Sequence, residues 1–93
     1  MSTSSAQLNI LKEAEHIIYG DREKTYGSPG KNLRKIADLW SAYLERDIRA
    51  EDVANLMILL KVARLINTPD HRDSLTDICG YAALIERVHV EEA

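Results

Sequence analysis

The feature that most constrains the fold is the segment 51–81, and above all its first half. A helix over residues 50–66 would be apolar on nearly every side, and helices of this kind are normally buried. Two cations, Lys61 and Arg64, are embedded in it, and at about 100° per residue neither has an obvious face toward solvent. Because a buried cation without a partner is strongly destabilising, the sequence predicts partners for both.

The second half of the segment supplies candidate partners. Residues 67–70 (NTPD) predict a break, because proline often follows a helix end, and a further helix is expected over residues 71–90. Asp73 and Asp77 lie four residues apart, and Tyr81 follows four residues later, so all three share one face of that helix. The two acids either neutralise the two cations in a helix–helix interface or belong to a site.

Two further helices are expected before this segment. Apolar residues recur at helical spacing over residues 5–19 and 30–46. A polar stretch that contains three glycines separates them and is predicted to be a loop, with consecutive turns at Ser28-Pro29-Gly30. No strand pattern and no internal repeat is present. The sequence therefore predicts an all-α fold of four helices, with Trp40 and Tyr43 expected in the core.

The bulk properties predict a single all-α domain over residues 1–93, with frayed ends at residues 1–5 and 90–93. A chain this short buries a modest core, so oligomerisation is expected to cover the apolar helix. The net charge of −3 argues against a general nucleic-acid binder. The single cysteine, Cys79, allows no intrachain disulfide and is expected to be a buried thiol. No signal-peptide pattern or membrane-spanning run appears, which favours a cytoplasmic location.

The loop after the first helix is a candidate for ligand contact. Arg22 and Lys24 would attract a phosphate, Gly27 would allow close approach of the backbone, and Tyr26 could stack on a base. The alternative is that this loop simply links two helices. It contains no GxxxxGK[ST] motif.

The paired acids allow a metal site. Carboxylates at i and i+4 project in the same direction, and acids on another helix could complete a site for Mg²⁺, which prefers oxygen ligands and often retains substrate phosphates in its shell. Lys61 and Arg64 would then lie beside the phosphates. Such a pair of acids is also common by chance in acidic helices. The histidines and Cys79 form no recognisable signature of nucleophilic catalysis, and no candidate recognition helix has a strongly basic exposed face.

Four short motifs carry a resemblance over nearly the whole chain: Tyr26-Gly27, IADLW at 36–40, LKVARL at 60–65 and DSLTDICGY at 73–81. With them the chain resembles small proteins of tailed phages and prophages, a family without an assigned activity. It is more distantly similar to nucleotide-modification-associated domains, which share a YG loop, a K-x-x-R-L helix and a D-x-x-x-D-x-x-x-Y helix. Those domains in turn look like the MazG-like all-α NTP pyrophosphatases.

The MazG-like resemblance implies a four-helix bundle completed by oligomerisation and a Mg²⁺-dependent cleavage of nucleoside triphosphates to monophosphate and pyrophosphate. It implies metal ligands at Asp73 and Asp77, with Asp52 or Glu51 from the preceding helix. The departure is clear, since the chain has no ExxE motif and its two aspartates are spaced by four residues where the MazG-like ExxD motif has three. The motifs therefore favour a nucleotide pocket over hydrolysis.

Three functions are consistent with these observations. The first is a phage-type nucleotide-binding protein, with Tyr81 and the loop and helix cations as ligand contacts and pyrophosphohydrolysis as its catalytic form. The second is a binding protein without catalysis that sequesters a host nucleotide signal. The third is a protein–protein interaction module, which predicts an exposed apolar patch and no bound nucleotide.

Overall fold

The computed structural model describes residues 9–19 and 28–92, which form four helices and no strand. The helices are α2 (Ile10–Tyr19), α4 (Pro29–Leu44), α5 (Ala50–Asn67) and α6 (Arg72–Glu92). The all-α prediction is confirmed, and the last three helices begin and end within two residues of their expected limits. None of the described helices is long and apolar enough to cross a membrane.

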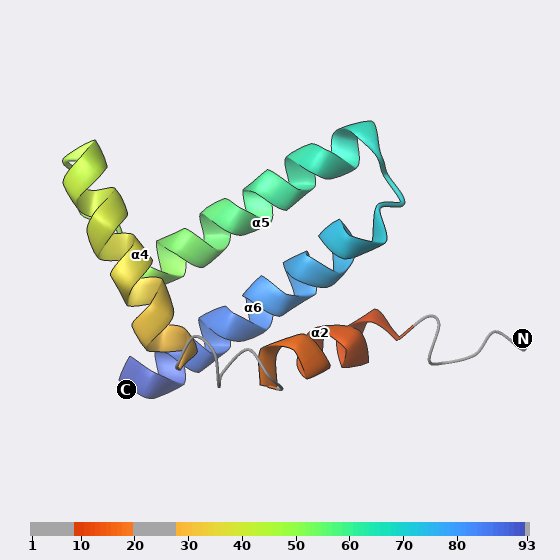
Figure 1. The fold of residues 1–93 in the computed structure, drawn as a ribbon, viewed down its shortest axis with the longest axis horizontal. Helices are drawn as coiled ribbons and strands as arrows, with labels where there is room; N and C mark the ends of the chain where they lie inside the picture. Colours follow the sequence, from red (N-terminus) through yellow and green to blue (C-terminus); the bar gives the residue numbers. More distant parts are fainter. Residues whose placement is uncertain (1–8, 20–27, 93) are drawn as a thin grey trace, which may run out of the picture.

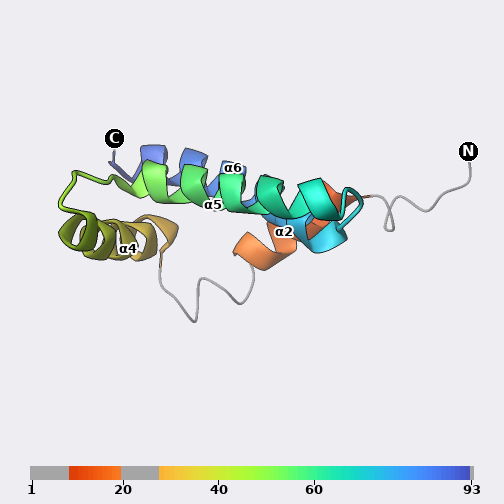
Figure 2. The same ribbon diagram turned by 90° about the horizontal axis from the view of Figure 1, so that it is seen from above.

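Helix α6 is the element around which the others are arranged, because it contacts all three of them. Helices α5 and α6 form an antiparallel pair joined by a short turn, and α2 lies along the other side of α6 (Figure 1). Helix α4 crosses the end of this pair at which α5 begins and α6 ends (Figures 1 and 2). The side of α5 that points away from α6 therefore faces no other described helix.

The main core lies where α4 crosses the pair. It is built from buried residues of α4, the first turns of α5 and the second half of α6, namely Leu33, Ala37, Ala50, Val53, Ala54, Leu84 and Val88. Trp40 packs against this cluster, as expected. Half of the eight buried apolar residues among the described positions are alanines. Because an alanine contributes little apolar area, this core is thin for the length of chain it holds together.

Two expectations for α4 are wrong. Ser28-Pro29-Gly30 begins the helix instead of forming turns: the Ser28 hydroxyl accepts the Lys31 N–H at 3.3 Å, and a proline at the first helical position suits the fixed φ of that residue. Tyr43 does not enter the core, since it is 87% exposed. It lies near the end of α4, on the side that neither α5 nor α6 covers.

The start of α4 is attached to the end of α6. The Gly30 N–H donates to the Glu91 carboxylate at 2.8 Å, and a negative charge is favourable at a helix N-terminus. The sequence places the end of this helix near residue 90, whereas α6 continues to Glu92. Helical periodicity does not show a contact between the Glu91 side chain and a residue far away in the sequence, which explains the difference.

Candidate functional site

Lys61 lies on the face of α5 that packs against α6. Its ammonium nitrogen is 2.8 Å from a carboxylate oxygen of Asp77, with the Lys61 side chain 11% exposed and that of Asp77 36% exposed. The predicted partnership between a cation of this helix and an acid of the next is confirmed for this pair. The pair is a direct polar contact between α5 and α6.

Arg64 and Asp73 are placed differently. Both residues are exposed, and no ion pair is seen between either of them and another residue in the described ranges. The expectation that Arg64 lacks a face toward solvent is therefore wrong. Helix α6 covers one side of α5, and Arg64 lies at the edge of that contact, one turn beyond Lys61.

The opposite side of α5 is apolar and exposed. This outer face consists of Leu56, Leu59, Leu60, Val62, Ala63 and Ile66, of which Leu59 is 61% and Ile66 77% exposed. The buried residues of α5 are confined to its first turns, at Ala50, Val53 and Ala54. The prediction of a helix buried on all sides is thus wrong for one chain, because α4 covers the start of α5 and α6 covers one side.

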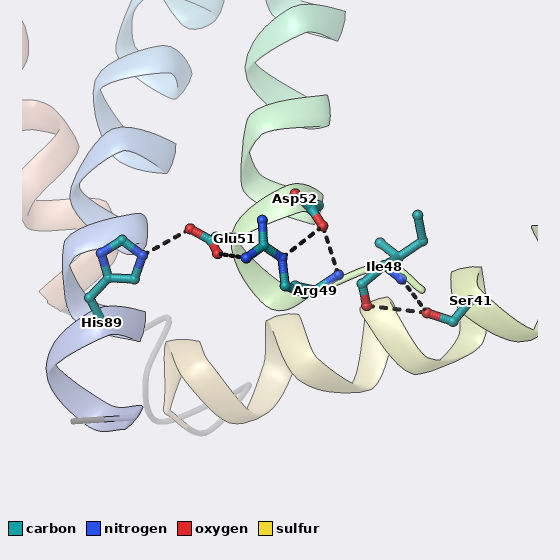
Figure 3. Close-up of polar contacts among 6 residues, drawn as sticks. All are labelled: Ser41, Ile48, Arg49, Glu51, Asp52 and His89. Carbon is teal, nitrogen blue, oxygen red and sulfur yellow. Dashed lines mark hydrogen bonds and ion pairs between the residues drawn. The ribbon is translucent and has the colours of Figure 1, made fainter. Parts of the chain in front are cut away.

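The first turn of α5 carries a second polar cluster (Figure 3). The Asp52 carboxylate accepts the Arg49 N–H at 2.9 Å, and Arg49 also lies 2.8 Å from Glu51. The Arg49 backbone N–H, followed by its side chain, lowers the pKa of Asp52, while the hydrogen bond to Asp52 and the charge of Glu51 raise the pKa of Arg49. His89 Nε2 is 3.0 Å from the other Glu51 oxygen, which connects this turn to the end of α6.

The link between α4 and α5 is held in the same region. The Ile48 N–H donates to the Ser41 hydroxyl oxygen at 2.8 Å, and that hydroxyl donates to the Ile48 carbonyl at 3.2 Å (Figure 3). These contacts hold the residues just before α5 against α4. The cluster therefore has a structural task at the start of α5, and Asp52 takes part in it as the acceptor at the helix N-terminus.

The predicted metal ligands do not come together in one chain. Asp52 lies in the first turn of α5, beside Glu51, which His89 contacts at one end of the helix pair, whereas Asp77 lies beside Lys61, nine positions further along α5. At about 1.5 Å per residue this separates Asp52 from Asp77 by more than 10 Å along the helix. Across the two described ranges, no group of three or more His, Cys, Asp or Glu side chains could hold a metal ion.

The remaining predicted contacts divide into two groups. Arg22, Lys24, Tyr26 and Gly27 lie outside the described residues. Tyr81 is partly buried and packs against the main core. Its place in the core gives Tyr81 a packing role, and its part in ligand binding stays a prediction.

Two polar contacts at the start of α6 were not foreseen. Arg72 lies 2.7 Å from Glu13 and attaches α2 to α6, and the His71 imidazole lies 2.7 Å from the Ser74 hydroxyl. The signal for the second contact is present in the sequence, as a polar residue three positions before a serine at a helix start. The first contact joins residues 59 positions apart and leaves no local signal.

Comparison with known proteins places the chain among phage proteins. It is 53% identical over 83 residues to the Gene 55 protein of Mycobacterium phage D29, which covers 89% of this chain and 55% of the relative. It is 43% identical over 86 residues to the Gene 55 protein of Mycobacterium phage L5, again covering 55% of the relative. The chain thus spans about half the length of the curated relatives it matches. No solved structure matches it.

The family comparison agrees with the resemblance to small phage proteins and leaves the more distant MazG-like similarity as a prediction. The model of the family described as "Domain of unknown function (DUF6378)" matches residues 9–89, which include all four described helices almost completely. The chain belongs to this DUF6378 family of phage proteins.

Proposed function

We propose that this chain is a binding protein that docks a polypeptide through the outer face of α5 and does not act by catalysis. The observation that carries the proposal is the exposure of six apolar side chains along one side of α5, on which no charged residue stands between Asp52 and Arg64. Exposed apolar patches of this kind mark interaction sites in folded proteins. They also fit the helix-in-groove and helix-pairing modes of recognition.

The contacts of Asp77 and Asp52 argue against the hydrolase alternative, because both acids already have partners among the described residues. Asp77 is engaged by Lys61 at 2.8 Å, and Asp52 accepts the N–H that begins α5. Recruiting either acid to a metal would leave a cation or a backbone donor without its present partner. The missing ExxE motif points in the same direction, since it removes the acids that would oppose the aspartates.

A second candidate function is nucleotide binding without hydrolysis, which Arg64 favours. This exposed guanidinium lies one turn from the Lys61–Asp77 pair and pairs with no other residue in the described ranges, so it is free to meet a phosphate. Arg64→Ala should weaken retention of a nucleotide. Replacing Arg22 and Lys24 by alanine together tests the loop that lies outside the described residues.

Native mass spectrometry of the purified chain decides between the two candidates. Under the docking proposal the wild type carries a polypeptide, its own or another, and the Leu59→Asp variant loses it. The matched control is Asp38→Ala, an exposed position on α4 at which the bound polypeptide should be retained.

Incubation with nucleoside triphosphates and cyclic nucleotides in the presence of Mg²⁺ completes the experiment. A monomeric chain that retains an intact nucleotide, equally in wild type and Leu59→Asp, would refute docking and support the second candidate. Release of monophosphate and pyrophosphate would refute both candidates in favour of the hydrolase.

A further inference from the structure

We infer that the polypeptide on the outer face of α5 is a second copy of this chain, bound as an antiparallel two-fold pair of α5 helices. The inference rests on the proposed docking function and names its partner. Three properties of the outer face carry it: its spacing, its lack of charge and the area it exposes.

The spacing is that of a helix-pairing surface. Leu56, Leu59, Ala63 and Ile66 follow one another at intervals of three, four and three residues, which is the repeat of the apolar positions in coiled coils. In an antiparallel pair centred near residue 61, Leu59 of one copy lies opposite Ala63 of the other, and Leu56 lies opposite Ile66. A large side chain thus meets a small one at the centre of the pair. Two-fold symmetry then satisfies both copies with the same surface.

The charge pattern selects a second copy over a charged partner. No ionisable residue stands on the outer face between Asp52 and Arg64, and Asn55 and Asn67 flank it near its two ends. A strongly acidic or basic segment would find no ion pair along this surface. Two copies meet without burying a charge, and the antiparallel arrangement sets their helix dipoles in opposite directions.

The exposed area is sufficient for a specific, modest interface. Covering the six side chains would remove roughly 500 Å² from each copy, or about 1,000 Å² in total, which is near the lower limit for specific interfaces. The thin main core gives such burial a large share in the stability of a short chain. Exposed apolar residues beyond this face, such as Leu39 on α4, are not needed for the pair.

Cysteine cross-linking tests the arrangement. In a Cys79→Ala background, chains carrying Leu59→Cys are mixed with chains carrying Ala63→Cys and oxidised, and the products are identified by mass. The antiparallel pair predicts the mixed disulfide between these two variants as the main product. Chains carrying Asp38→Cys, on the exposed side of α4, are the control and should not cross-link above background. Self-linking of each variant in place of the mixed product would indicate a parallel pair and overturn the proposed geometry.

Sedimentation velocity tests the partner itself. The wild type should sediment as a dimer at tens of micromolar. Leu59→Asp should weaken the dimer by at least about 100-fold, because a central apolar residue is replaced in both copies. Its helical content is checked by circular dichroism. If Leu59→Asp does not fold, Leu59→Gln is the milder variant, and the cross-linking remains informative.

The failures of the two proposals are distinguishable. A wild type that stays monomeric at several hundred micromolar overturns the second copy as partner. The docking function is then judged by whether native mass spectrometry finds a different polypeptide that Leu59→Asp releases. A dimer that survives Leu59→Asp with unchanged affinity overturns the assignment of the outer face in both proposals.

Discussion

The two faces of α5 are both mostly apolar and have opposite surroundings. The inner face packs Val53 and Ala54 into the main core and carries the largely buried Lys61, whose charge is matched by Asp77. The outer face is more uniformly apolar, contains no charged residue, and leaves Leu59 and Ile66 largely exposed. The face that includes a charge is covered by the chain's own helices, and the face without one is not.

The difference shows what apolarity of a helix does and does not specify. It indicates that each face gains free energy when it is removed from water. It does not say whether the covering surface belongs to the same chain. A charge on the inner face is tolerated because α6 brings an acid to a fixed position, whereas an uncharged outer face requires no such specific partner and suits a surface identical to itself.

The largest effect should come from placing the same charge on the two faces. Val53→Asp buries a carboxylate at a position that is 1% exposed, and its cost of several kcal/mol is comparable to the whole stability of a small domain. We expect Val53→Asp to lose its helical circular dichroism signal. Leu59→Asp, the matched change at a 61% exposed position, should retain more of it. A Val53→Asp variant as stable as the wild type would contradict the proposed difference between the inner and outer faces.

An intermediate effect should come from the charged pair on the inner face. Asp77→Asn leaves the Lys61 ammonium without its carboxylate and should lower the free energy of unfolding by about 1–3 kcal/mol, less than for a fully buried pair because Asp77 is 36% exposed. Replacing both residues, as Lys61→Met with Asp77→Leu, should be close to neutral, since neither charge is then unpaired. Urea unfolding of Lys61→Met, of Asp77→Leu and of the double variant measures the coupling free energy between the two residues. Independent, additive effects would mean that the pair does not contribute as a unit.

The smallest effect should come from lowering the pH, which acts on Asp52 in the first turn of α5. The pKa of Asp52 is lowered in the folded chain by the Arg49 N–H and side chain. Its contribution is therefore fully present above the ordinary pKa of an aspartate, about 3.9, and is lost as the pH falls through the lowered folded pKa. Asp52→Asn keeps a side-chain oxygen for the helix start and removes the charge. Its small destabilisation at neutral pH should vanish in acid, and a difference that grows in acid would contradict this role.

The helices and part of the site could be predicted from the sequence. Periodicity located four helices, and the need of a buried cation for a partner led to the Lys61–Asp77 pair. The same reasoning failed for Arg64, which lies three residues from Lys61 and within about 60° of it around the helix. One helix packed alongside can bury the first of these positions and leave the second exposed, so helical angle alone does not decide between them.

The exposure of the outer face of α5 and of Tyr43 could not be predicted for a related reason. Sequence patterns show which residues share a face, whereas the position of α4 across one end of the pair depends on contacts between distant residues, such as Gly30 with Glu91. Such contacts depend on the whole fold. The distance between Asp52 and Asp77 has the same origin, because the antiparallel order of α5 and α6 places them at different levels.

The most direct test of the central claim is the dependence of unfolding on protein concentration. If a second copy covers the outer face, folding and pairing are linked, and the urea midpoint of the wild type should rise as the concentration is raised. Each tenfold increase contributes about 1.4 kcal/mol per mole of dimer. Leu59→Asp should remove this dependence, and Asp38→Ala should leave it unchanged. A wild-type midpoint that stays constant over a hundredfold range, from low to high micromolar, would contradict the pairing of two copies through α5.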